Sequence, residues 1–466
     1  MALTLALFGD TTTDVPLRGL SIDSRTLQPG ELFAAVRGER FDGHHFIDQA
    51  IAAGCAAVLA EQPPATPLPV PLLIVENVLQ TLGEAARRWR DQVNPLVLAV
   101  TGSCGKTTVK EMLTRCLQQK FASVHATRGN LNNHIGLPLT LLAMPEHCQA
   151  LVVELGMSAA GEIAYLAQLA KPDIGIITNV QPAHLEAFAN LDAIVEAKAE
   201  LLEALPTHGV AIFPFGQPYT PRLQQKAGEV NTRTFGPNPP ADIFYHSATT
   251  AEPNPPEKTA ANLFTIHWQA EQDGVQTRLG QHGEHLRQNA LAVAAAARAA
   301  GLTTSQIAAG LENFAPPTGR GGIRQTPQGW RVVDDSYNAN PGSVQAALQA
   351  LPEPAQPGRR IAVLGDMLEL GKEAEMLHAG LLPALISSGV SLLFTAGPLM
   401  QALHQAVQAH PWQAGEQPIT AWHRPDPADW LEQIAPQLQP EDVVLVKGSR
   451  GMKMERIVNN LVTHAL

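Results

Sequence analysis

The stretch VLAVTGSCGKTTVKEML, residues 97–113, decides which fold this chain can adopt. It opens with an apolar run typical of a buried strand, continues with a turn that holds two glycines, and ends in a helical pattern. A strand, a glycine turn, a Lys-Thr pair and a helix start are the parts of a phosphate-binding loop. Backbone N–H groups, the helix N-terminus and Lys106 would attract phosphate, and the Thr107 hydroxyl suits Mg²⁺. We therefore predict that a nucleotide is bound by Gly102, Ser103, Cys104, Gly105, Lys106, Thr107 and Thr108.

This loop departs from the standard pattern G-x-x-x-x-G-K-[ST], because Val100 stands where that pattern has its first glycine. The alternative is a glycine turn that joins a strand to a helix and binds no ligand. The order of strand, turn and helix around the Lys-Thr pair favours the nucleotide site.

Composition limits the classes of protein to which the chain can belong. Its 466 residues predict about three domains, and 45% hydrophobic with 16% charged residues indicate large buried cores. A net charge of −11 argues against a nucleic-acid partner, which needs a basic face, but not against a small anionic substrate.

Cysteine usage and hydropathy indicate a cytoplasmic protein. Cys55, Cys104, Cys116 and Cys148 show no C-x-x-C or metal-binding spacing, which predicts reduced thiols. The N-terminal run lacks the basic residues of a signal peptide, and no run approaches the ~18 apolar residues of a membrane span. We expect no membrane span and, for Cys104, a backbone role more than a role of its sulfur.

Strand-like and helical stretches alternate along most of the chain and predict an α/β fold with mostly parallel sheets. Residues 1–94 resemble a small α/β unit, and residues 95–316 contain the phosphate loop and further strand–helix repeats. Residues 317–466 predict a second open parallel sheet of dinucleotide-fold type, although it lacks G-x-G-x-x-G. Within the central unit, residues 236–258 are rich in Pro, Thr and Ala and predict a loop or insertion.

Polar residues follow several predicted strands, at the sheet edge where ligands bind in open α/β folds. Glu154 and Asn179 each end a strand near the phosphate loop, and His184 lies in the next loop. Glu154 suits Mg²⁺, which prefers carboxylate and phosphate oxygens. Solvated surface positions are the alternative. Further residues at strand ends are Asp334, Asp335, Asp366 and Lys447.

Two asparagine-rich segments and one lysine have uncertain roles from their residue types alone. Residues 127–138, TRGNLNNHIGLP, fit neither a helix nor a strand, and their amides suit an anionic or sugar substrate. Residues 334–341, DDSYNANP, predict a turn that starts a helix, with a ligand role equally open. Lys198, on an amphipathic stretch, would by itself be a solvated lysine.

Together these motifs resemble the Mur ligases, the ATP-dependent amide-forming enzymes of peptidoglycan synthesis. The motifs occur in the family's order along essentially the whole chain: TGSCGKTT, ELG, TNVQPAHL, EAKAE, HLRQN, a Gly-Arg pair and DDSYNAN. Within the family, DSRT, GNLNNHIGLP, LGDMLELG and LVKGSR are most similar to the member that adds D-alanyl-D-alanine to UDP-N-acetylmuramoyl-tripeptide. The D-N-P-R motif of the member that adds the third peptide residue is absent from the sequence.

The resemblance implies a role for each matching residue. Lys106 would reach the β- and γ-phosphates of ATP, and Thr107 and Glu154 would bind one Mg²⁺. His184 and a carbamylated Lys198 would serve a second Mg²⁺. For Lys198, this role replaces the solvated surface position that its residue type alone suggests. Contacts to adenine, phosphate and the nucleotide would come from Asn289, Arg320 and Asp335.

The substrate-binding residues are also carried over from the resemblance. The muramoyl peptide would contact Asn130, Asn132 and Asn133, and the D-alanyl-D-alanine would contact Asn338 and Asn340. The UDP end would contact Ser24, Arg25, Phe41, Asp42, Gly43 and His44. Leu286 stands where the family often has asparagine, and Ala199 where glycine often follows the carbamylated lysine.

Two rival functions remain at this point. The first is another enzyme of the same fold group, a folylpolyglutamate synthase or the ligase of the third peptide residue. The second is a regulatory protein that uses the phosphate loop as a switch, against which the set of Glu154, His184 and Lys198 argues. We expect a monomer, and the sequence leaves open whether the tripeptide ends in lysine or diaminopimelate.

Overall fold

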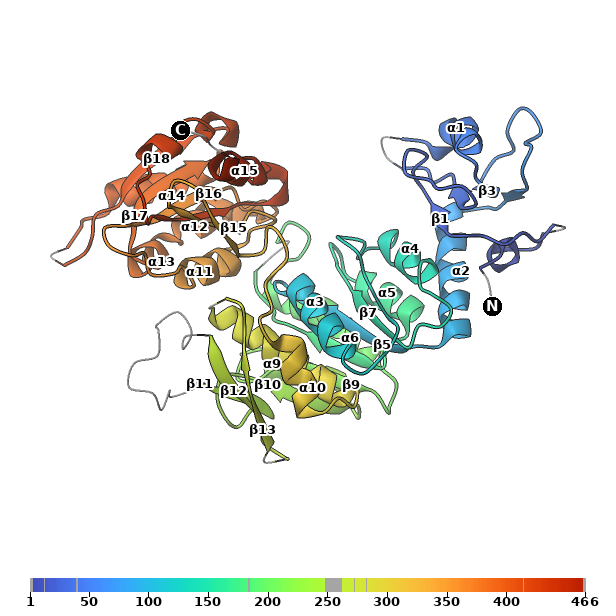
Figure 1. Ribbon diagram of the computed structural model, residues 1–466, viewed down its shortest axis with the longest axis horizontal. Helices are drawn as coiled ribbons and strands as arrows, with labels where there is room; N and C mark the ends of the chain where they lie inside the picture. The colour runs from blue at the N-terminus through green and yellow to red at the C-terminus, as the bar shows by residue number, and fades with distance from the viewer. Residues whose placement is uncertain are drawn as a thin grey trace.

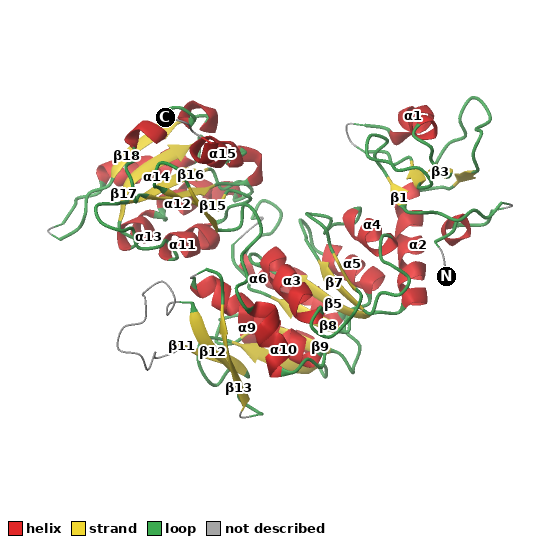
Figure 2. Ribbon diagram, viewed as in Figure 1, coloured by secondary structure: helices red, strands yellow, loops and turns green. Residues whose placement is uncertain are grey.

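The computed structural model describes residues 3–11, 13–38, 41–182, 185–247, 262–271, 273–281, 283–413 and 415–463. Three sheets follow one another along the chain, and Figure 1 shows them as three units, coloured blue, cyan to yellow, and orange to red. Figure 2 shows the same arrangement with helices in red and strands in yellow. The predicted α/β fold with mostly parallel sheets is confirmed. Short 3-10 helices are η1 (Leu5–Phe8), η2 (Gly43–Phe46), η3 (Gly371–Glu373), η4 (Pro427–Trp430), η5 (Ala435–Gln437) and η6 (Arg450–Met452).

The N-terminal sheet is small and wholly parallel, in the order β1-β2-β3-β4. Its strands are β1 (Leu20–Ser21), β2 (Leu32–Ala34), β3 (Ala57–Ala60) and β4 (Leu72–Ile74). Helix α1 (Ile47–Ala52) packs on it, and α2 (Val78–Val93) leads out of it. Helix α2 begins at Asn77, whose side chain accepts a hydrogen bond from the backbone N–H of Gln80.

Helix α2 belongs to two cores at once. It contacts η1 of the N-terminal unit, and it packs along α4 (Gly136–Leu142) and α5 (Glu162–Ala170) of the central unit. The Trp89 indole donates a hydrogen bond of 2.9 Å to the carbonyl of Met144. The buried residues of both units therefore form one continuous cluster through this helix.

The central sheet has nine strands in the order β13-β12-β11-β10-β9-β8-β5-β7-β6. Pairing is parallel from β6 to β11 and antiparallel from β11 to β13. The strands are β5 (Leu96–Thr101), β6 (Val124–Ala126), β7 (Ala150–Glu154), β8 (Ile174–Ile177), β9 (Val210–Pro214), β10 (Asn231–Phe235), β11 (Ile243–Ser247), β12 (Leu263–Trp268) and β13 (Asp273–Arg278).

Alternation of side chains along each strand gives this sheet two buried faces. Val97 and Ala99 of β5 point into one core, and Leu98 and Val100 point into the other. The first face is covered by α2, α4, α5, α6 (Leu191–Glu203) and α7 (Thr220–Ala227). The second is covered by α3 (Lys106–Leu117), α9 (Glu284–Ala299) and α10 (Thr304–Leu311).

The C-terminal sheet has six strands in the order β14-β15-β19-β16-β17-β18, all parallel except β14. They are β14 (Gly322–Gln325), β15 (Arg331–Asp335), β16 (Arg360–Gly365), β17 (Val390–Ala396), β18 (Thr420–Arg424) and β19 (Val443–Lys447). Its helices are α11 (Pro341–Gln349), α12 (Ala374–Ala379), α13 (Leu382–Ser387), α14 (Met400–Ala409) and α15 (Glu455–Thr463).

Two local predictions were wrong in part. The predicted loop of residues 236–258 contains strand β11 at Ile243–Ser247, and its residues 248–258 lie outside the described residues. The Pro, Thr and Ala content of that segment indicates a loop, although it contains a strand that pairs with β10 and β12. The end of the asparagine-rich segment is helical, because α4 begins at Gly136.

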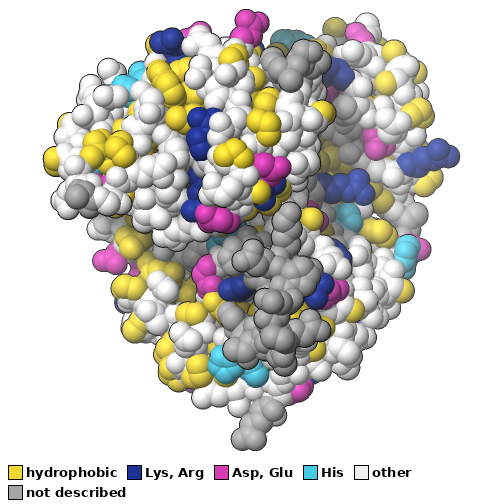
Figure 3. All heavy atoms as spheres, turned by 60° about the vertical axis from the view of Figure 1, so that its left-hand side comes forward, with side chains coloured by type: hydrophobic (Ala, Val, Ile, Leu, Met, Phe, Trp, Pro, Cys, Tyr) yellow, Lys and Arg dark blue, Asp and Glu magenta, His cyan; other side chains and the backbone are white. Residues whose placement is uncertain are grey.

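The surface gives two further observations. No helix within the described residues is both long and apolar enough to cross a membrane. On the face shown in Figure 3, Lys and Arg side chains lie in separate small groups among apolar and neutral ones.

Candidate functional site

The phosphate loop lies between β5 and α3, as predicted. Gly105 has φ +83°, and a Cβ there would lie 2.6 Å from Oδ1 of Asn289. A Cβ on Gly102 would lie 1.9 Å from Oγ1 of Thr178, so only glycine fits either position. The Lys106 ammonium donates to the Gly102 carbonyl at 2.8 Å, which curls the side chain over its own loop.

Charged groups surround Lys106 in the cleft. Loss of solvation lowers the pKa of Lys106, and the negative charge of Glu154 opposes that shift. Arg320, from the chain that leads into the C-terminal unit, adds a second cation and lowers the same pKa further. Two cations beside a glycine loop form a site for a polyanion.

Glu154 lies at the end of β7 and is 3% exposed. Its Oε2 accepts a hydrogen bond of 2.9 Å from the Thr107 hydroxyl, and its Oε1 accepts one of 2.8 Å from Nδ2 of Asn132. Arg320 in turn donates to the Thr107 hydroxyl at 3.1 Å. Residues from the phosphate loop, the asparagine-rich loop and the third unit thus meet around one carboxylate.

Lys198 is buried, contrary to what its residue type alone suggests. It lies on α6 with 3% exposure, and no hydrogen bond or ion pair to it is found among the described residues. Burial lowers its pKa well below the ordinary value of 10.5, and the nearby charge of Lys106 lowers it further. His184, predicted as its companion, lies outside the described residues.

The C-terminal unit brings its own charged pair to the cleft. Lys447, at the end of β19, donates to Oδ2 of Asp335 at 2.6 Å and to the Asn338 carbonyl at 2.8 Å. The guanidinium of Arg320 lies 4.0 Å from the ring centroid of Tyr337, in cation–π contact. The loop after β15 is therefore held by its neighbours in the sheet before any ligand arrives.

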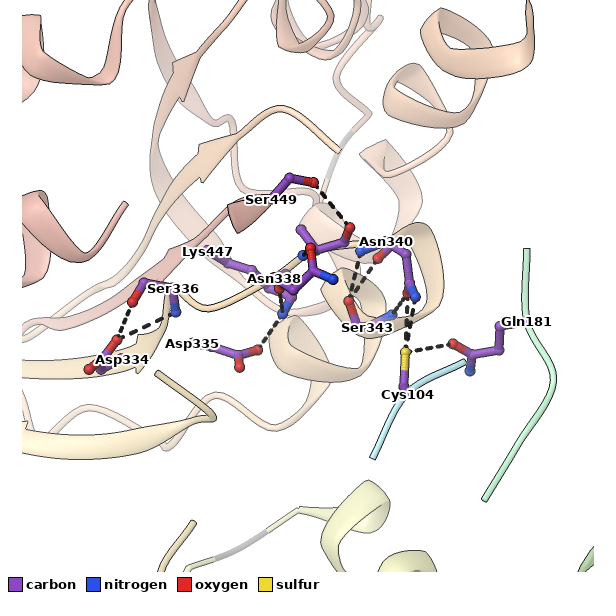
Figure 4. A network of polar contacts seen from close by, with 11 residues as sticks. Cys104, Gln181, Asp334, Asp335, Ser336, Asn338, Asn340, Ser343, Lys447 and Ser449 are labelled. Atoms are coloured by element: carbon purple, nitrogen blue, oxygen red, sulfur yellow. Dashed lines mark hydrogen bonds and ion pairs between the residues drawn. The ribbon is translucent and has the colours of Figure 1, made fainter. Parts of the chain in front are cut away.

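A sulfur contact joins the phosphate loop to this unit (Figure 4). Nδ2 of Asn340 lies 3.0 Å from Sγ of Cys104, and that sulfur lies 3.4 Å from Oε1 of Gln181. The Cys104 backbone is also bonded, since its N–H donates to Oδ1 of Asn179 at 3.0 Å. The backbone role predicted for Cys104 is thus accompanied by a sulfur contact between units.

Two predicted substrate asparagines also accept hydrogen bonds from backbone N–H groups at helix starts. Oδ1 of Asn340 accepts from the backbone N–H of Ser343 and begins α11. Oδ1 of Asn133 accepts from the N–H of Gly136 at 2.9 Å, at the start of α4. Asn130 lies in the same loop as Asn132, its carbonyl accepting the Asn132 N–H at 2.8 Å. Capping explains part of why asparagine stands at position 340.

The predicted N-terminal residues lie in the first unit, and their side-chain bonds stay within it. Arg25 pairs with Asp23 at 2.6 Å, and Ser24 donates to Oε1 of Gln49 at 2.8 Å. Phe41 is 73% exposed.

His44 is fixed on both ring nitrogens. Its Nδ1 lies 2.6 Å from Oδ1 of Asp42, and its Nε2 lies 3.0 Å from the Glu61 backbone nitrogen. Hydrogen bonds from the His44 N–H and ring lower the pKa of Asp42 to about 2. Gly43 has no room for a side chain, because a Cβ would lie 2.7 Å from the Val36 nitrogen.

A cavity of about 500 Å³ opens between the central and C-terminal units. It is lined by nine of the predicted residues: Ser103, Cys104, Gly105, Thr108, Asn289, Arg320, Asp335, Asn338 and Asn340. Leu286 also lines it and is otherwise packed in the core. Leucine at this position offers an apolar contact where the asparagine that is common in the family would offer a polar one. The predicted N-terminal residues do not line this cavity.

Sequence reasoning missed several residues of the same cavity. Thr178 and Gln181 flank Asn179 after β8, and their place after a strand could have been recognised. The sequence places Lys447 at a strand end but does not indicate its partner. The structure shows that this partner is Asp335. Tyr337 does not line the cavity but contacts Arg320, which does, and an aromatic residue inside the polar segment DDSYNANP could have been recognised.

Models of known families match three parts of the chain. A Mur ligase family catalytic-domain model matches residues 16–90, and a Mur ligase middle-domain model matches residues 100–297. A Mur ligase glutamate ligase domain model matches residues 319–450. Together the three models cover most of the chain.

Individual relatives align over nearly the full length. A UDP-N-acetylmuramoyl-tripeptide–D-alanyl-D-alanine ligase of Escherichia coli is 36% identical, covering 96% of this chain and 94% of its own. A crystal structure of MurF from Acinetobacter baumannii has a TM-score of 0.83 at 32% identity, covering 97% and 95%. MurF from Thermotoga maritima in complex with ADP has a TM-score of 0.80 at 29% identity, covering 98% of each chain.

Proposed function

The chain belongs to the Mur ligase family, and we propose that it joins D-alanyl-D-alanine to UDP-N-acetylmuramoyl-tripeptide with hydrolysis of ATP. The products are UDP-N-acetylmuramoyl-pentapeptide, ADP and phosphate, in the synthesis of peptidoglycan. The observation that carries this function is the cavity of about 500 Å³ in which the phosphate loop faces Arg320, Asp335 and Asn340 of another unit. The full-length similarity to ligases of this specificity supports the choice of substrates.

The chemistry begins with activation of a carboxylate. The terminal carboxylate of the tripeptide attacks the γ-phosphorus of ATP, ADP leaves, and an acyl phosphate forms. The amine of D-alanyl-D-alanine then attacks the acyl carbon, and phosphate leaves from the tetrahedral intermediate as the amide forms. Phosphoryl transfer needs positioning and charge neutralisation more than covalent help, which is what Lys106, Arg320 and the loop N–H groups can give.

The oxygen donors in the cleft fit Mg²⁺. Thr107 Oγ1 and Glu154 Oε2 lie 2.9 Å apart beside the phosphate loop, and both are oxygen ligands of the kind Mg²⁺ prefers. No cluster of three or more His, Cys, Asp or Glu suited to a metal occurs within the described residues, so phosphate and water would complete the shell. When bound, Mg²⁺ would neutralise charge on the phosphates.

Lys198 is proposed to be carbamylated. Its amine would attack CO₂ and lose a proton, which leaves a carbamate anion in place of an ammonium. The lowered pKa supports this step, because only the neutral amine is a nucleophile. The carbamate oxygens and His184 are proposed to serve a second Mg²⁺.

We assign the substrates to the three units. Residues 1–94 would hold the UDP end, residues 95–316 the ATP, and residues 317–466 part of the ATP and the D-alanyl-D-alanine near Asn338 and Asn340. We further propose that the enzyme works as a monomer in the cytoplasm without a nucleic-acid partner.

Release of phosphate tests the reaction and separates it from its rivals. We expect release only when ATP, UDP-N-acetylmuramoyl-tripeptide and D-alanyl-D-alanine are all present, with tripeptides ending in lysine and in diaminopimelate assayed in parallel. Release with folate and glutamate, or with a UDP-dipeptide and a third amino acid, would overturn the proposal. Hydrolysis that needs no acceptor would favour a nucleotide switch.

Carbamylation has its own test. Lys198→Ala should lose most activity, and short carboxylates such as acetate should restore part of it by supplying the missing oxygens. A fully active Lys198→Ala enzyme would contradict the role of this lysine.

A further inference from the structure

Lys110 is a buried charge that the reaction described above does not use. It lies on α3, one turn beyond Lys106, and its side chain is 2% exposed. A buried ammonium is costly unless it is paired and hydrogen-bonded. Its partners therefore indicate what the charge is for.

The ammonium of Lys110 connects α3 to the start of the asparagine-rich loop. It donates to the Thr127 carbonyl at 2.7 Å and to Oε1 of Glu111 at 2.5 Å. The Glu111 carboxylate is 42% exposed, so water screens the ion pair between Lys110 and Glu111. The contact to Thr127 is the fully buried one.

Thr127 carries the connection on to Glu154. Its side chain is buried, and its hydroxyl oxygen accepts the backbone N–H of Glu154 at 3.0 Å. The loop that begins at Thr127 then returns to the same carboxylate through Asn132, and the Asn132 carbonyl accepts the N–H of Gly156 at 2.8 Å. The loop is thus held at its first residue by Lys110 and near its middle by the Glu154 segment.

We infer that Lys110 is a positioning residue for the muramoyl-peptide side of the site. It fixes the asparagine-rich loop to the helix that carries the phosphate lysine, so that Asn130, Asn132 and Asn133 face the substrate in a set geometry. This inference rests on the proposed function. Lys106 and Lys110 lie on the same helix. Lys106 would contact ATP, and Lys110 holds the loop that would contact the muramoyl peptide.

Selective binding tests this role. Lys110→Met removes the charge and its hydrogen bonds but keeps an unbranched side chain. We expect UDP-N-acetylmuramoyl-tripeptide to bind the variant about tenfold or more weakly, the effect of losing a hydrogen bond to a charged group. ADP should bind within about twofold of wild type. Isothermal titration calorimetry measures both affinities without turnover.

Glu111→Gln is the matched control, since it alters the exposed partner and leaves the contact to Thr127; both affinities should stay near wild type. Equal weakening of both ligands by Lys110→Met, or a lower melting temperature with both affinities unchanged, would overturn the inference. If Lys110→Met does not fold, Lys110→Arg keeps the charge and displaces the donor. A selective loss of tripeptide binding in Lys110→Arg supports the inference, and wild-type affinities overturn it. Failure of the wild type to bind the tripeptide would instead overturn the proposed function.

Discussion

The cleft between the central and C-terminal units and the candidate face of the N-terminal unit hold their polar side chains differently. In the cleft, Glu154 and Arg320 both bond to the Thr107 hydroxyl, although the three residues are far apart in sequence. In the N-terminal unit, Arg25 and His44 bond to carboxylates two residues away, and Phe41 is largely exposed. A network of long-range bonds fixes geometry before substrate arrives, whereas local bonds and an exposed ring suit capture of a ligand. Changes in the cleft should therefore affect turnover or the use of ATP, and changes in the N-terminal unit should affect only the affinity for the UDP substrate.

The largest effect is expected at Glu154. Glu154→Gln keeps the shape and the contact to Thr107 but removes the charge that would hold Mg²⁺. We expect kcat to fall by about 10²–10³-fold, as when a preorganised electrostatic group is removed. Steady-state phosphate release measures it, with Glu203→Gln on the exposed side of α6 as control. A kcat close to that of wild type would place Glu154 outside the reaction.

A smaller effect is expected at the far side of the same cleft. Asp335→Ala removes a proposed nucleotide contact and leaves the buried ammonium of Lys447 without its 2.6 Å partner. We expect the KM for ATP to rise about tenfold while the fold is retained, as circular dichroism would verify. Asp335→Asn should show a milder form of the same change. Unchanged ATP kinetics in Asp335→Ala would remove this residue from the site.

Burial of Lys198 in the central unit should lower the free energy of unfolding, and no such effect is expected from the exposed side chains of the N-terminal unit. Its lowered pKa means that this amine binds a proton less readily in the fold than in the unfolded chain, where the ordinary pKa is 10.5. The free energy of unfolding therefore rises with pH toward that value. In CO₂-free buffer at pH 7, Lys198→Met should be more stable by about 1–3 kcal/mol, and the difference should shrink as pH increases.

Thermal unfolding at several pH values measures this difference. Lys226→Met is the contrasting control, because ion pairs with Glu196 and Glu203 raise the pKa of Lys226 and its loss should lower stability. A Lys198→Met variant that is less stable at neutral pH would show that burial of this lysine is not costly.

The smallest effect is expected at Phe41. Because its ring is 73% exposed and would stack on the uracil base, Phe41→Ala should raise the KM for the UDP substrate about fivefold. Both kcat and the melting temperature should be unchanged. A fall in kcat would break the distinction between the two regions, since it would give this ring a part in turnover.

Much of the fold and part of the candidate site could be predicted because their signals are local. The glycine turn with Lys106, and polar residues such as Glu154 at strand ends, are patterns of a few residues. Strand β11 was missed because its Ile243–Ser247 segment adjoins a Pro-rich stretch, and its pairing partners are not adjacent in sequence.

Contacts between distant segments could not be predicted from the same patterns. The sulfur of Cys104 and the amide of Asn340 are 236 residues apart, and nothing near either residue indicates the other. Burial of Lys198 and Lys110 depends in the same way on helices packed against the sheet, so both resemble solvated lysines until the fold is known.

Helix α2 limits how this enzyme could exchange parts with its relatives. Because its apolar face covers α4 and α5, a fragment starting after residue 94 would expose that surface and should aggregate. A chimaera with another N-terminal unit would have to retain the buried side of α2, including Trp89. The unit that would recognise UDP is therefore not a free module, and changes of donor specificity should arise in its loops and not by replacement of the whole unit.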